Sequence, residues 1–265
     1  MQIVFLTVLA LILSRPIAAQ PVSCGPSAAK YAELNRQLIV ENKADAERYP
    51  EVREAVTEQL RQLVDQQVSE QLNIDKSPNP ANIVARIRCL QQSLPQYRPY
   101  PDITNVPFAI AVGDGSPAVV VAYEIYRGGK GAPDTMPVFE AFLPEWNKWH
   151  PIARTGQDLT GSTFFVSPLN AGRPGEHWFL LHGKRFGDSG SRLDLEVISF
   201  DGMRLKTVWA RTGISRTAIA EVANDHIVLI GESLNERGRA QEFRDQYDVS
   251  VDGLKLVSRK ITKSF

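Results

Sequence analysis

Three tandem copies of one pattern, between Arg98 and Leu256, constrain this 265-residue chain more than any other feature. The first copy recurs in the second at a shift of 56 (154 − 98). The matching pairs are Arg98 and Arg154, Asp102 and Asp158, Thr104 and Thr160, Phe108 and Phe164, Glu140 and Glu196, and Trp149 and Leu205. A period near 50 residues belongs to repeat architectures, so we expect one structural unit built three times.

Two further matches extend the repeat toward the C-terminus. Residues 153–156 read Ala-Arg-Thr-Gly and return as residues 210–213, a shift of 57 (210 − 153). The third copy follows the second at a shift of 51 (250 − 199). It matches Ser199, Asp201, Gly202 and Leu205 with Ser250, Asp252, Gly253 and Leu256.

Each copy reads as about four short β-strands. The first strands are predicted at 108–112, 164–167 and 218–222, and the second strands at 118–126, 177–183 and 226–231. The second strands are almost continuously apolar, which is typical of strands buried on both faces. The third and fourth strands form a hairpin, in which Asp201-Gly202 and Asp252-Gly253 favour type I′ turns. The first copy has Glu145-Trp146 at this point, so we expect a different turn there.

Such a unit resembles a β-propeller blade. Propellers close with four to eight blades, so three units cannot form a ring alone. One alternative is a homodimer that completes a six-bladed ring. The other, which we favour, is a single chain whose open or barrel-like meander is covered at its edges by helices, because exposed edges invite aggregation.

The segment before the repeats is predicted to be helical. Residues 28–40 and 50–72 carry apolar stripes, and Pro50 suits a first helical turn. A third helix begins at Asn79-Pro80, an N-cap followed by proline. Prolines between 95 and 101 end this segment. The apolar stripes either pack on one another and on the β region or serve as a partner-binding arm.

The predicted fold class is therefore α+β and mostly β. An N-terminal helical hairpin or cap of about three helices occupies residues 20–97. An antiparallel β meander of three four-stranded, propeller-blade-like repeats follows at 98–265, divided at about 98–153, 154–210 and 211–260.

The N-terminus predicts export. An apolar run at Ile3–Leu13, followed by Ala18-Ala19, has the layout of a signal peptide cleaved after Ala19, and the run is too short to span a bilayer. No later run is long enough to cross a membrane. We therefore expect a secreted or periplasmic protein. Its two cysteines, Cys24 and Cys89, are then expected to form a disulfide.

Composition argues against several classes of ligand. Loss of residues 1–19 removes Arg15, which leaves 29 (30 − 1) basic against 30 acidic residues, so nucleic acid binding is not expected. The four histidines show no metal-ligand spacing, and we predict neither a metal nor another cofactor. The histidines are His150, His177, His182 and His226.

Basic groups gather in the predicted loops between second and third strands. If these loops share one rim, they could hold a carboxylate, an acidic glycan or an acidic protein loop through charge-assisted hydrogen bonds. The candidate residues are Arg127, Lys130, Lys184, Arg185, Arg237 and Arg239. Trp146, expected to be exposed, is a further candidate contact.

Two functions follow from these features. The first is an exported, non-enzymatic binding or interaction protein that uses the rim loops. The alternative is a secreted or periplasmic hydrolase with a carboxylate site at the same rim, for which Asp114, Asp134 and Asp188 are the candidate groups.

Overall fold

In the residues that it describes, this computed structural model contains three helices and twelve strands. The structure describes residues 24–44, 50–75, 77–94, 106–113, 117–128, 134–155, 163–187, 190–215, 217–223, 226–234, 239–250 and 253–263. The helices are α1 (Gly25–Ala44), α2 (Pro50–Ile74) and α3 (Pro80–Gln92). The predicted fold class, α+β and mostly β with three four-stranded antiparallel units, is confirmed.

The strands form three separate four-stranded meanders. Sheet 1 contains β1 (Phe108–Val112), β2 (Ala118–Gly128), β3 (Asp134–Glu145) and β4 (Lys148–Thr155). Sheet 2 contains β5 (Thr163–Leu169), β6 (His177–Gly187), β7 (Gly190–Phe200) and β8 (Leu205–Ile214). Sheet 3 contains β9 (Ile219–Ala223), β10 (His226–Leu234), β11 (Ala240–Ser250) and β12 (Gly253–Lys263).

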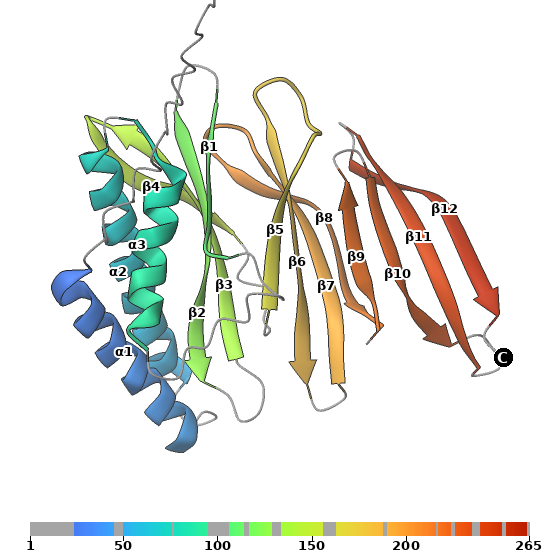
Figure 1. Cartoon of the computed structure of the whole chain (residues 1–265), viewed down its shortest axis with the longest axis horizontal. Helices are drawn as coiled ribbons and strands as arrows, with labels where there is room; N and C mark the ends of the chain where they lie inside the picture. Colours follow the sequence, from blue (N-terminus) through green and yellow to red (C-terminus); the bar gives the residue numbers. More distant parts are fainter. Residues whose placement is uncertain are drawn as a thin grey trace, which may run out of the picture.

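The helices and sheets are stacked in the order helices, sheet 1, sheet 2, sheet 3 (Figure 1). Each junction has its own apolar core. Helices and sheet 1 share a core that contains Leu60, Val64 and Val121. Sheets 1 and 2 share one that contains Phe139 and Phe179, with ring centroids 5.3 Å apart. Sheets 2 and 3 share one around Leu195. Both faces of sheets 1 and 2 are therefore buried, which explains the continuous apolar runs in their second strands.

The helical layer is fixed to sheet 1 by polar contacts as well as by its apolar stripe. The amide groups of Asn35 and Gln91 donate hydrogen bonds to the backbone carbonyls of Tyr126 and Glu124. The backbone N–H of Trp149 donates to Asn73 Oδ1 at 3.2 Å. The helices thus cover one open face of the β stack.

Local signals in the helical segment act as predicted. The Asn79 side chain accepts a hydrogen bond from the Ala81 N–H at 3.1 Å and caps α3, with Pro80 in its first turn.

The predicted disulfide between Cys24 and Cys89 is present, with a Cα–Cα distance of 6.0 Å, and it ties α1 to α3. Disulfides are typical of oxidising compartments. Among the described helices, none is long and apolar enough to span a membrane. The predicted signal peptide lies outside the described residues.

A β-bulge at the same place in each sheet demonstrates the structural repeat. The register between third and fourth strands shifts between Ala141 and Phe142, between Val197 and Ile198, and between Gln246 and Tyr247. The spacings are 56 (197 − 141) and 49 (246 − 197). The extra residue in the fourth strand is β-branched each time: Ile152, Val208 and Val257.

This register confirms part of the sequence alignment and corrects the rest. Glu140 does correspond to Glu196, and Trp149 to Leu205. The shift of 57 is wrong by one residue, since Arg154 pairs with Glu140 whereas Arg211 pairs with Leu195. Directly paired residues share a face of the sheet, so the two arginines point to opposite sides.

The shift of 51 between the second and third copies is wrong by two residues. Leu205 pairs with Phe200, and its counterpart is Leu254 (205 + 49), which pairs with Val249. Leu254 packs against the core, whereas Leu256 is 42% exposed. Phe108 likewise corresponds to Phe165 rather than to Phe164, because they pair with Ala122 and His182, which are equivalent in β2 and β6. The matches at Arg98, Asp102, Thr104, Asp158 and Thr160 lie outside the described residues.

The hairpin turns also differ from the prediction. Positive φ at both central residues, which a type I′ turn requires, occurs at Trp146 (51°) and Asn147 (63°) in the first copy. In the second copy only Gly202, the first central residue, has a positive φ (93°), as in a type II′ turn. Gly253 is a strand residue that pairs with Ser250, and Asp252 lies outside the described residues.

The third strand of sheet 3 is polar on its outer face. In sheet 2, Leu193, Leu195 and Val197 face sheet 3 and are buried. Their counterparts on β11, 49 residues later, are Glu242, Arg244 and Gln246. Arg244 forms an ion pair of 3.4 Å with Glu221 on this face. Polar residues at these positions are typical of the last unit of a stack.

Candidate functional site

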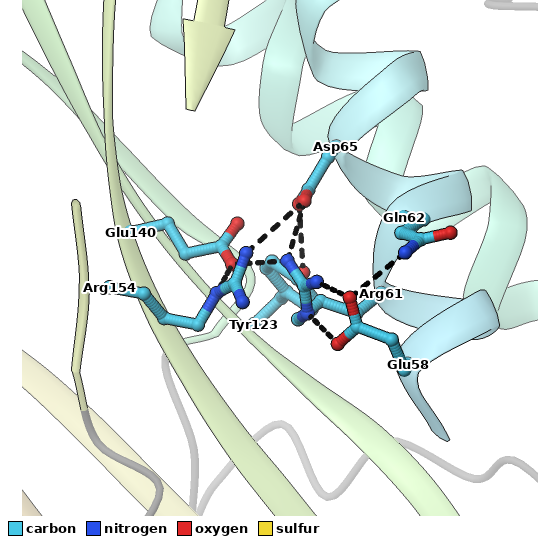
Figure 2. A network of polar contacts seen from close by, with 7 residues as sticks. All are labelled: Glu58, Arg61, Gln62, Asp65, Tyr123, Glu140 and Arg154. Atoms are coloured by element: carbon cyan, nitrogen blue, oxygen red, sulfur yellow. Dashed lines mark hydrogen bonds and ion pairs between the residues drawn. The ribbon is translucent and has the colours of Figure 1, made fainter. Parts of the chain in front are cut away.

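A network of charged side chains joins α2 to sheet 1 (Figure 2). Arg61 and Asp65 come from successive turns of α2, and Glu140 and Arg154 are a cross-strand pair of β3 and β4. The Arg61 Nη1 donates to Asp65 Oδ2 at 2.8 Å and to Glu140 Oε1 at 3.3 Å. Arg154 Nε donates to the same Glu140 oxygen, and its Nη2 lies 3.6 Å from Asp65 Oδ2. Each arginine therefore contacts an acid of the helix and an acid of the sheet.

Burial sets the protonation of this network. The Glu140 side chain is 0% exposed. Burial, with the nearby Asp65 carboxylate, raises the pKa of Glu140, although Arg61 opposes the rise. Tyr123 donates to Asp65 Oδ1 at 3.3 Å, and burial raises its pKa too. The charges of Arg61 and Arg154 are matched by the acidic side chains of Asp65, Glu58 and Glu140. We therefore interpret the network as a clamp between layers.

A second acid–arginine cluster lies between sheets 2 and 3. Asp245 of β11 pairs across the sheet with Arg259 of β12, whose Nε and Nη2 donate to both carboxylate oxygens at 2.7 and 2.6 Å. Arg211 of β8 reaches over from sheet 2, and its Nη1 donates to Asp245 Oδ2 at 3.1 Å and to the Tyr247 hydroxyl. Burial alone raises the pKa of Asp245, but these arginine hydrogen bonds outweigh it and hold that pKa below its ordinary value.

Aromatic rings adjoin this second cluster. The rings of Trp209 and Tyr247 have centroids 5.5 Å apart, and the guanidinium carbon of Arg211 lies 6.0 Å from the Tyr247 ring centroid. Unlike Arg61, the two arginines are accessible: the side chains of Arg211 and Arg259 are 32% and 49% exposed. Two guanidinium groups face one carboxylate, so the cluster carries an excess positive charge.

The two clusters occupy equivalent places in the stack. Glu140, Glu196 and Asp245 are related by the bulge register (196 − 140 = 56, 245 − 196 = 49), and each faces the layer before it. At the junction of sheets 1 and 2, Glu196 receives a hydrogen bond from Thr207. The position that is Arg154 in sheet 1 and Arg259 in sheet 3 is Ala210 there.

The basic residues predicted to line a rim are only partly placed. The C-terminal ends of β2, β6 and β10 lie at the same end of the stack (Figure 1). Arg127 lies at a bulge near the end of β2 and Lys184 within β6; both are half-buried. Arg239 is exposed just before β11. Lys130, Arg237 and the side chain of Arg185 lie outside the described part of the chain, as do Asp114, Asp188 and the side chain of Asp134.

Trp146 lies apart from the predicted rim. It is 91% exposed at the turn between β3 and β4, whereas Arg127 and Lys184 are near the other ends of their strands. Trp149 is buried against the helices. Trp146 therefore shares no site with Arg127 or Lys184.

Sequence reasoning missed the groups with the most unusual environments. Burial raises the pKa of Glu124, on β2, to about 8 and lowers that of His182, on β6, to about 4. His182 is stacked on Phe165, with centroids 5.1 Å apart. In the described ranges, no group of three His, Cys, Asp or Glu side chains could hold a metal ion. The acid–arginine clusters gave one sequence signal, the spacing of 14 residues in Glu140–Arg154 and Asp245–Arg259.

Comparisons with known proteins add little. No protein-family model matches the chain, and no curated protein matches it. Among solved structures, the chain is similar to a BT0996–RGII complex, with a TM-score of 0.29 and 11% sequence identity. The match covers 56% of this protein, which spans about half (55%) of the length of the BT0996 protein in that structure. Similarity this low assigns neither a fold nor a function.

Proposed function

We propose that this protein is an exported, non-enzymatic binding protein that recognises an acidic ligand through groups on its β stack. The observation that supports it best is the unequal exposure of the two acid–arginine clusters. At α2 the carboxyl groups of Asp65 and Glu140 lie between the helix and sheet 1, and Glu140 has no exposed side-chain surface. Between sheets 2 and 3 the accessible groups are cations beside aromatic rings.

This exposure favours binding over hydrolysis. A hydrolase that uses two carboxylates needs both to reach the substrate, with pKa values set apart for acid and base roles. The carboxyl groups of Asp65 and Glu140 are instead enclosed by Arg61, Arg154 and Tyr123. Arginine and aromatic side chains, in contrast, are enriched at the energetically dominant positions of binding surfaces.

The test is a ligand screen with the full-length chain after export. Acidic oligosaccharides and acidic peptides are titrated by calorimetry, and each mixture is then analysed for products by mass spectrometry. We expect saturable binding of at least one acidic ligand with no product. Turnover of a bound ligand, or no binding to any acidic ligand, would contradict the proposal. Ligand binding by Arg127→Ala and Lys184→Ala is measured in parallel, to test the basic residues predicted to line the rim.

A further inference from the structure

The junction of sheets 1 and 2 shows what stacking two sheets requires. At the five positions that form the second cluster, this junction has Ala153 and Thr155 on sheet 1 and Glu196, Ile198 and Ala210 on sheet 2. The corresponding residues between sheets 2 and 3 are Trp209, Arg211, Asp245, Tyr247 and Arg259, at shifts of 56 and 49. An equivalent junction therefore packs without an arginine or an aromatic ring at any of these positions.

The donors of the second cluster are not exhausted by the protein. Arg259 uses Nε and Nη2 on Asp245, and Arg211 uses Nη1. Within the described residues, Nε and Nη2 of Arg211 and Nη1 of Arg259 donate to no protein acceptor. The bidentate contact with Asp245 holds the Arg259 fork in place, so a ligand need not order that side chain on binding.

The other side chains that face this cluster leave its charge unbalanced. They include Leu195 and Val197 from sheet 2 and Ile227, Leu229, Phe243, Leu256 and Ile261 from sheet 3, all apolar. Leu256 and Ile261 are 42% and 53% exposed. One carboxylate against two guanidinium groups leaves a net charge of +1, with apolar and aromatic surface beside it. A monoanionic group on a ring with an apolar face matches both features.

From this arrangement we infer that the edge between β8 and β12 binds a carboxylated sugar, with Arg211 and Arg259 on the carboxylate and Trp209 against the face of the sugar ring. This rests on the proposed function and names its ligand class. A guanidinium fork suits a carboxylate, and an aromatic ring supplies a large, rigid contact surface beside it. The alternative ligand, an acidic peptide, offers the same carboxylate but no ring for Trp209.

The neighbouring junction supplies the test variants. Trp209→Ala, Arg211→Thr and Arg259→Ala each install the residue that the equivalent junction already contains. The probe is trigalacturonic acid, titrated by calorimetry and by tryptophan fluorescence, with neutral galactotriose and hexaglutamate as comparators. Arg154→Ala is the matched control, because Arg154 occupies the position of Arg259 in sheet 1. Circular dichroism confirms that each variant is folded.

We expect wild type and Arg154→Ala to bind trigalacturonic acid alike and galactotriose at least tenfold more weakly. Each of the three junction variants should weaken binding at least tenfold, and Trp209→Ala should also lose the fluorescence change. Equal binding by wild type and all three variants would overturn this site while leaving the proposed function intact. Tighter binding of hexaglutamate would overturn the ligand class. Absence of binding to every acidic probe would overturn both the site and the proposed function.

Discussion

The same arrangement of one acid and two arginines occurs at the junction of α2 with sheet 1 and at the junction of sheet 2 with sheet 3. In both, an acid on a third strand is held by an arginine of its own fourth strand and by an arginine of the preceding layer. Arg61 of α2 does at the first junction what Arg211 of β8 does at the second. A helix thus takes the place of a preceding sheet.

The difference between these junctions is exposure and charge. At α2 the arginine is almost completely buried and its charge is matched by Asp65 and Glu58. Between sheets 2 and 3 the arginines reach solvent and outnumber the acid. We infer that one copy of the arrangement stabilises the layers and that the other serves the proposed binding function.

Removing the buried arginine should produce the largest effect. Arg61→Ala leaves Asp65 and Glu140 with Arg154 as their one remaining shared partner, and breaking a buried ion pair in this way costs about 3–5 kcal/mol. We expect urea unfolding to show a loss of about 3 kcal/mol. The control is Arg36→Ala, which breaks an exposed pair with Glu33 on α1 and should change little. Equal effects of the two substitutions would mean that the network at α2 is no clamp.

The acid between sheets 2 and 3 should matter next, and only above acidic pH. Because the folded pKa of Asp245 is lowered, its stabilisation is present above the unfolded pKa and is lost as pH falls through the folded pKa. We expect Asp245→Asn to cost about 2 kcal/mol at pH 7, the usual size for a hydrogen bond to a charged group. Urea unfolding at pH 7 and pH 3 should show this cost shrinking at the lower pH. A cost that grows on acidification would contradict the assignment.

The equivalent acid at α2 should behave in the opposite way. The raised pKa of Glu140 means that the fold favours its protonated form, so its contribution is largest below the unfolded pKa and declines as pH rises. Glu140→Gln keeps the shape of the neutral acid without the cost of protonating it, so we expect the variant to be more stable than wild type near pH 7.

The pH series from 5 to 9 distinguishes the two acids. Relative to wild type, Glu140→Gln should gain stability as pH rises. The unfolding free energy of the variant should still fall partly as pH rises, because the pKa of Glu124 is also raised, to about 8. A Gln variant that loses stability relative to wild type as pH rises would show that Glu140 is ionised in the fold.

The smallest effect is expected at the exposed turn. Trp146 has a positive φ, which is unfavourable for a side chain with a Cβ, and it is 91% exposed. Its counterpart in sheet 2 is Gly202 (146 + 56), so Trp146→Gly installs the residue that this position already has there. We expect a stabilisation of up to about 1 kcal/mol. Calorimetric melting should show a slightly raised Tm, and a lowered Tm would indicate that Trp146 packs on the protein.

Patterns that act locally were predicted from the sequence, whereas register was not. The Asn79-Pro80 cap, the apolar stripe of α2 and the buried second strands follow from nearest neighbours along the chain. The repeated Ala-Arg-Thr-Gly misled because sequence identity and strand register differ by one residue, and a slip of one reverses the face of every side chain. Arg154 and Arg211 therefore looked equivalent but face opposite ways.

The acid–arginine clusters could not be predicted because their partners are distant in sequence. Arg61 and Glu140 are 79 residues apart, and Arg211 and Asp245 belong to different sheets. Nothing in the α2 pattern distinguishes Arg61, which contacts Glu140 of β3, from Arg53, the other arginine of this helix. The side on which a helix packs, and the distance between stacked sheets, are tertiary properties.

The most direct test of these separate roles, stabilisation at α2 and binding between sheets 2 and 3, is urea unfolding with and without saturating trigalacturonic acid. It compares wild type with Arg154→Ala and Arg211→Thr. A ligand that binds only the folded state raises the unfolding free energy, by about 2.7 kcal/mol at a hundredfold excess over Kd. We expect Arg154→Ala to be less stable than wild type but to gain as much unfolding free energy from the ligand, whereas Arg211→Thr should gain almost none. A full gain in Arg211→Thr, or loss of the gain in Arg154→Ala, would contradict the separate roles of the two junctions.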